Sequence, residues 1–108
     1  MDIETEAGRS RADFRVPLAP DQVLARLRGA VAADRRFELL DADEAHADLA
    51  ARFNSTTWGG RIHLRWVRLD AASSMVAGEW RPRRPARVAF TGGEDDLRAL
   101  AALLDAAD

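Results

Sequence analysis

The chain has 108 residues, of which 47% are hydrophobic and 31% are charged, and its formal net charge is −2. This composition is typical of one globular domain and gives no sign of a nucleic-acid or membrane partner. The absence of cysteine excludes thiolate chemistry, and the absence of lysine excludes a Schiff-base or P-loop lysine. Because no apolar run approaches the roughly 18 residues of a membrane span and the N-terminus is acidic, we expect a cytoplasmic protein.

The N-terminal segment predicts a tail and then a strand. Residues 1–10 are polar and have no periodicity, so we expect a flexible tail followed by a single α+β domain over residues 11–108. Apolar and polar residues alternate from Ala12 to Leu18, which predicts a half-buried strand. Since Pro17 has no backbone donor, this strand should lie at an edge of the sheet or end there.

A helix and a second short strand follow. Pro20 suits the first position of a helix, and apolar residues at helical spacing predict that the helix continues to about Asp34. The period then returns to two, and Phe37 and Leu39 predict a short strand that ends at Asp41.

The middle of the chain predicts another strand and a loop. Apolar and polar residues alternate over 44–53, which favours a strand, although an alanine-rich helix also fits these residues. Residues Asn54–Gly60 are mostly small and polar, which is typical of a loop.

The clearest alternation in the chain predicts a hairpin of two strands. Its inner residues are Ile62, Leu64, Trp66, Val76, Gly78 and Trp80. We expect a register that sets Leu64 opposite Trp80 and Trp66 opposite Gly78, because a large ring then lies over the missing side chain. A slip of one residue would mix the apolar and polar faces.

The C-terminal part predicts an extended segment and a helix. Residues before proline avoid the α region, so Arg81–Pro85 should be extended, and residues 86–90 predict one more short strand. Thr91 and Glu94 match a capping box. Apolar residues then recur at helical spacing, which predicts an amphipathic C-terminal helix.

The order of these elements predicts an α+β domain. A curved antiparallel sheet of about five strands would pack against a long C-terminal helix, in the order β-α-β(4-5)-α. The order over residues 12–107, and the junction from Arg81–Pro85 through Phe90 and Gly92-Gly93 to Leu97, resemble a shortened helix-grip domain of the Bet v1-like or START-like class. A TATA-binding-protein-like β-α-β4-α order fits the number of elements equally well.

The resemblance implies that an apolar small molecule binds between the sheet and the C-terminal helix. The chain departs from the class because it is shorter and has no second short helix after the first. On this interpretation the ligand-binding residues are Leu64, Trp66, Val76, Trp80, Leu97, Leu100, Ala101 and Leu104. The same residues have a simpler interpretation as the hydrophobic core.

The two histidines are the obvious candidates for metal binding or base catalysis. His46 and His63, with Glu44 or Asp48, could ligate a metal. Their spacing matches no metal motif, however, and the expected pairing sets His63 opposite Arg52. We therefore predict no metal site and no cofactor.

Two carboxylate clusters and two glycine pairs have structural explanations. Asp41, Asp43 and Glu44 fall in a predicted turn. Glu94, Asp95 and Asp96 fall at a helix start, where acidic residues interact favourably with the helix dipole. The glycine pairs Gly59-Gly60 and Gly92-Gly93 match no phosphate-binding motif, and a turn and a helix cap explain them. With no nucleophile and base in a recognisable arrangement, we predict no catalytic residues and a non-enzymatic domain.

The alternative function is a protein-interaction module or accessory subunit. Trp58 lies in the predicted loop, and an exposed tryptophan can anchor an interface. Arg81, Arg83 and Arg84 form the densest basic stretch and would extend that surface to a protein partner or a second copy of the chain. Because aromatic stacking partners are sparse, we do not expect a nucleic-acid partner.

Overall fold

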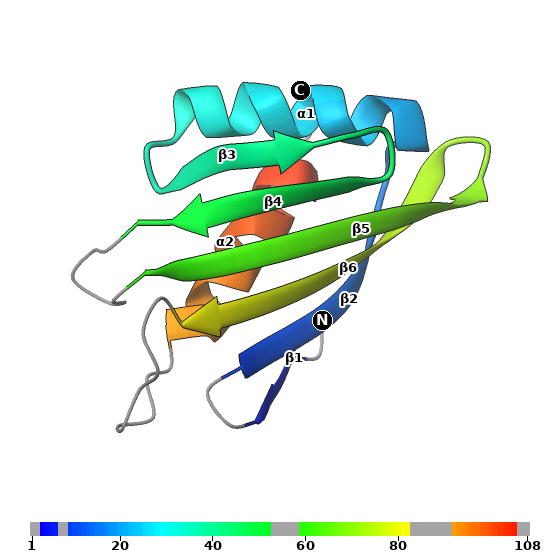
Figure 1. Ribbon diagram of the computed structural model, residues 1–108. Coiled ribbons are helices and arrows are strands. Elements are labelled where there is room, and N and C mark those ends of the chain that lie inside the picture. Colours follow the sequence, from blue (N-terminus) through cyan, green and yellow to red (C-terminus); the bar gives the residue numbers. More distant parts are fainter. Residues whose placement is uncertain (1–2, 7–8, 53–58, 83–91, 106–108) are drawn as a thin grey trace.

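The computed structural model describes residues 3–6, 9–52, 59–82 and 92–105. In chain order the elements are β1 (Ile3–Glu6), β2 (Arg9–Val16), α1 (Pro20–Ala33), β3 (Phe37–Ala42), β4 (His46–Ala51), β5 (Gly60–Asp70), β6 (Ser73–Pro82) and α2 (Gly92–Asp105). The strands form one antiparallel sheet in the order β1-β2-β6-β5-β4-β3 (Figure 1). The predicted α+β class is thus confirmed.

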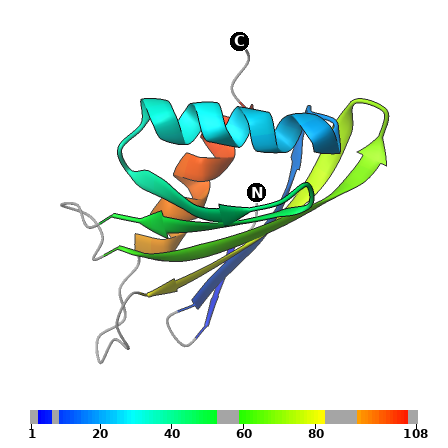
Figure 2. The same cartoon turned by 45° about the horizontal axis from the view of Figure 1, so that its top comes forward.

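The sheet has one apolar face and one polar face because its side chains alternate. Every second residue of β2, β4 and most of β5 is buried. The inward residues pack against both helices, α2 against β2 and β6 and α1 against β3 (Figures 1 and 2). The opposite face of the sheet is polar, and no described helix packs on it.

Both helices form in the predicted parts of the chain. α1 begins at Pro20 and ends at Ala33, and the backbone becomes extended at Asp34. Val23 and Leu27 are buried on the inner face of this helix. α2 has 14 residues, the same length as α1, so the prediction of a long C-terminal helix is wrong. The predicted strand over 86–90 and the capping residue Thr91 lie outside the described residues.

The N-terminal tail is corrected in part. Residues 3–6 form β1, and β2 begins at Arg9, so most of the predicted tail belongs to the sheet. β1 pairs with β2 through its backbone, and only Ile3 of β1 is partly buried, which is why the segment has no apolar periodicity. β2 ends at Val16, directly before Pro17, and a strand end at this proline was one of the two expectations. Residues 46–51 form strand β4, so the helical alternative for them is wrong.

The predicted hairpin of β5 and β6 exists, but its register is shifted by two residues. Leu64 lies opposite Gly78 and Ile62 lies opposite Trp80, where the prediction set Leu64 opposite Trp80. The inner and outer faces are nevertheless as expected, because a shift of two preserves them. The cause is the tight turn at 71–72 with a bulge between Arg68 and Asp70, since turn length fixes hairpin register.

Two glycines make room for the largest buried side chain. The indole of Trp80 is 1% exposed and lies against the backbone of Gly60 on β5 and Gly93 at the start of α2. A Cβ atom at Gly93 would lie 2.6 Å from Trp80 Cδ2 and 2.8 Å from Ser10 Oγ. The glycines that sequence reasoning assigned to a turn and a cap are therefore also sites of close packing.

We expect Gly93→Ala to lower the free energy of unfolding by about 1–3 kcal/mol, because the added methyl group overpacks a filled core. Chemical denaturation measures the change. Gly29→Ala is the matched control, since no atom lies within 4 Å of its Cβ position in α1. The control should gain about 0.5–1 kcal/mol. Equal effects of the two substitutions would contradict this account of Trp80 packing.

Candidate functional site

The residues predicted to line an apolar cleft do come together. Leu64 and Trp66 of β5 and Val76 and Trp80 of β6 face the helices, and α2 contributes Leu97, Leu100, Ala101 and Leu104. Seven of the eight are at most 2% exposed, and Ala101 packs at the margin of the same core. In this structure they form the centre of the hydrophobic core, which was the simpler interpretation.

A buried carboxylate fixes the start of α2 to this core. Trp80 Nε1 donates a hydrogen bond to Asp96 Oδ2 at 2.9 Å, and Arg36 Nε and Nη2 donate to Asp96 Oδ1 at 3.0 and 2.8 Å. Asp96 is 0% exposed. Burial raises its pKa, and the hydrogen bond and charge of Arg36 oppose that effect.

Sequence reasoning missed the buried position of Asp96 and assigned it to the helix dipole. The helical spacing could have predicted this burial, because Asp96, Leu100 and Leu104 are four residues apart and share one helix face. Leu100 and Leu104 were expected to face inward, and an acidic residue on that face requires a donor inside the protein. Trp80 and Arg36 supply the donors.

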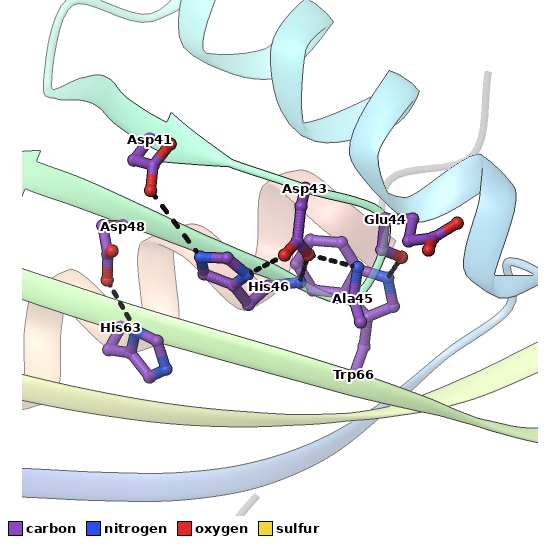
Figure 3. Close-up of polar contacts among 8 residues, drawn as sticks. All are labelled: Asp41, Asp43, Glu44, Ala45, His46, Asp48, His63 and Trp66. Carbon is purple, nitrogen blue, oxygen red and sulfur yellow. Dashed lines mark hydrogen bonds and ion pairs between the residues drawn. The ribbon is translucent and has the colours of Figure 1, made fainter.

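A second group of residues lies on the polar face of the sheet. Asp41 of β3 pairs with Asp48 of β4, and Asp48 pairs with His63 of β5, so these three side chains form one row across three strands. His46 lies two residues before Asp48 on the same face. We call Asp41, His46, Asp48 and His63 the outer-face cluster (Figure 3).

Hydrogen bonds set the positions of both histidines. His46 Nδ1 lies 2.7 Å from Asp43 Oδ2, and His46 Nε2 lies 3.8 Å from Asp41 Oδ2. His63 Nδ1 lies 2.5 Å from Asp48 Oδ1. The two imidazole ring centres are 5.8 Å apart.

Asp43 is held by the hairpin turn between β3 and β4. The backbone N–H groups of Ala45 and His46 donate to Asp43 Oδ1 at 2.8 and 2.9 Å. These bonds, the Ala45 bond first and then those with His46, lower the pKa of Asp43. Its carboxylate is therefore charged at neutral pH and faces the imidazole of His46.

The predicted pairing of the histidine strands is corrected. His63 lies opposite Asp48, and the prediction that it lies opposite Arg52 is wrong. The register between β4 and β5 depends on where each strand meets the intervening loop, and period-two alternation fits registers that differ by two or four residues equally well.

The polar face also contains two shallow grooves that share His63 and Glu79. Their volumes are about 470 and 620 Å³. Arg81, one of the residues predicted to bind a partner, lines the first groove, and its Nε donates to Glu79 Oε1 at 2.9 Å. The hydrogen bond and charge of Arg81 lower the pKa of Glu79. Trp58, Arg83 and Arg84 lie outside the described residues, so the predicted partner surface stays a prediction.

No protein-family model and no curated protein matches this chain. Among solved structures, Ara h 8.0201 is similar over 90% of this chain and 94% of its own, with 8% identity and a TM-score of 0.49. The Zhui aromatase/cyclase from Streptomyces sp. R1128 is similar over 89% of this chain and 82% of its own, with 12% identity and a TM-score of 0.36. At these identities each likeness is one of fold alone.

Neither described helix is both long enough and apolar enough to cross a membrane.

We expect Asp96→Asn to lower the free energy of unfolding at neutral pH by about 1–3 kcal/mol, because both oxygens of Asp96 accept hydrogen bonds and asparagine has only one acceptor oxygen, so one buried donor of Trp80 or Arg36 loses its partner. Asp95→Asn is the matched control, since Asp95 is exposed one residue earlier. Its loss should stay below about 1 kcal/mol. Urea unfolding of both variants measures the difference, and equal losses would contradict a structural role for Asp96.

The wild type and Asp96→Asn should also differ in how their free energy of unfolding depends on pH. Because burial raises the pKa of Asp96 in the folded state, the stability gained by its protonation is fully present below the unfolded pKa. This gain is lost as the pH rises through the folded pKa. Unfolding measured from acid to neutral pH should show this loss in the wild type, and Asp96→Asn should lack it.

Proposed function

We propose that this chain is a non-catalytic binding domain that takes an apolar small molecule between β5, β6 and α2. The eight residues predicted from the sequence to bind a ligand would contact it. Their side chains are hydrocarbon and indole groups, which supply contact area rather than chemistry. The proposal is independent of the likeness to solved structures, since it rests on how α2 is attached.

The observation that supports the proposal is the uneven attachment of α2. Within the described part of the chain, every side-chain hydrogen bond or ion pair from α2 to another element comes from Asp96, in its first turns. The later inward residues, Leu100 and Leu104, contribute only apolar packing. One end of α2 is thus held by directional bonds and the other by non-directional ones.

This difference indicates where a ligand can enter. Apolar contacts are roughly proportional to the area removed from water, at about 25 cal/mol per Å², and they do not depend on a particular partner atom. An apolar ligand can replace contacts between Leu104 and the sheet with contacts to itself, and no buried polar group is left without a partner. The bonds of Asp96 keep the start of α2 in place during the exchange.

Ala101 allows a sharp test, since it packs at the margin of the core and the next residue, Ala102, is exposed on the same helix. We expect the neutral fluorophore N-phenyl-1-naphthylamine to bind the wild type at one saturable site and to quench emission from the buried tryptophans. Ala101→Phe should weaken this binding at least tenfold, because the ring occupies the space of the ligand.

Ala102→Phe is the control, and it should leave binding unchanged. Thermal melting of both variants verifies that each is folded. An absence of saturable binding to the wild type would overturn the proposal, and so would an equal loss of affinity in the two variants.

A further inference from the structure

We propose that Asp41, His46 and Asp48 form a binding site for one divalent transition-metal ion on the polar face of the sheet. Their donor atoms all lie within 4.8 Å of one another. The site lies on the opposite face of the sheet from the apolar interior, so it does not depend on the function proposed above.

A β-bulge brings the third ligand to this face. Leu39 pairs with Leu49, but Asp41 pairs with Asp48, so β3 has one more residue than β4 at this point. In a regular strand Asp41 would have the same orientation as Leu39, toward the interior. The bulge turns the Asp41 carboxylate outward beside Asp48 and leaves Leu40 exposed.

The orientation of His46 is that of a metal ligand. Asp43 accepts a hydrogen bond from His46 Nδ1 at 2.7 Å, so the lone pair of the neutral ring is on Nε2. Nε2 faces Asp41 Oδ2 at 3.8 Å (Figure 3). Metal-binding histidines commonly give their second N–H to a carboxylate, which fixes the ring and raises its basicity. Asp43 fixes the ring of His46 in this way, and two backbone N–H groups fix Asp43 itself.

Asp48 is oriented by a different partner. Its Oδ1 is bonded to His63 Nδ1, which leaves Oδ2 as the free oxygen of this carboxylate. Two ligand atoms about 2.1 Å from a tetrahedral ion are about 3.4 Å apart, so small side-chain rotations close the site around an ion. The side chains of His46 and Asp48 are 29% and 42% exposed, so an ion reaches them directly from solvent.

The donor set indicates the class of ion. One imidazole nitrogen and two carboxylate oxygens suit zinc and neighbouring transition metals, whereas magnesium and calcium prefer oxygen ligands alone. Water would complete the coordination. Three carboxylates, those of Asp41, Asp43 and Asp48, lie within ion-pair distance of the two histidines and favour a cation. Arg65 pairs with His46 across the sheet, and Arg61 and Arg81 line the groove beside Asp41 and Asp48, but no ion pair within the described residues joins an arginine to these carboxylates.

The test is calorimetric titration of the untagged full chain with zinc chloride, after treatment with a chelator. We expect one saturable site and a rise in melting temperature with zinc, because a ligand that binds the folded state stabilises it. Magnesium chloride at the same concentration should cause no shift.

Three variants identify the ligands. His46→Gln and Asp41→Asn should each weaken zinc binding at least tenfold, and Asp43→Asn should weaken it by about 10–100-fold by releasing the His46 ring. Asp13→Asn is the control, because Asp13 is a carboxylate on β2 outside the cluster, and it should bind zinc as the wild type does. Circular dichroism verifies that each variant is folded.

Two results would overturn the proposal. One is that the folded wild type binds no zinc at a saturable site. The other is that His46→Gln and Asp41→Asn bind zinc as tightly as Asp13→Asn, which would indicate non-specific binding to surface carboxylates. Neither result affects the fluorophore test of the interior, so the two proposals fail separately.

Discussion

The buried carboxylate of Asp96 connects three parts of the fold that are distant in sequence. It accepts hydrogen bonds from Trp80 on β6 and from Arg36, which lies in the turn between α1 and β3. A buried charge without these donors would cost several kcal/mol, so α2 is constrained to the one position that satisfies Asp96. The close approach of Gly60 and Gly93 to Trp80 is part of the same arrangement, because a Cβ atom at either glycine would lie 2.6 Å or less from the indole that donates to Asp96.

The alternation of the strands separates two surfaces with different chemistry. Inward side chains such as Leu64 and Val76 bury apolar area against the helices, and outward ones such as His63 and Glu79 meet water. Since each residue belongs to one face only, the two proposed sites use separate sets of side chains. The proposed metal ion on the outer face would require no movement of α2, whereas the proposed apolar ligand inside would.

Local patterns in the sequence were sufficient to predict most elements and the composition of each face. Pro20 predicted the start of α1, and the alternation around Leu64 predicted β5, because both depend on neighbouring residues. The hairpin register could not be predicted, since it depends on turn geometry and on a bulge that alternation does not reveal. β1 was missed because its pairing is a backbone interaction, and Asp96 was missed because its donors are far away in the sequence.

The outer-face cluster illustrates why a site of this kind is difficult to find in one sequence. His46 and His63 belong to different strands, and their proximity depends on the register between β4 and β5. Asp41 joins them only because β3 contains a bulge, and a regular strand through Leu39 and Leu40 would turn its carboxylate inward. Asp41 is therefore positioned by an irregularity, whereas His46 and Asp48 share a face because they are two residues apart on β4. The metal signatures that sequence reasoning searched for are local spacings, and a site that takes its ligands from two strands contains no complete one.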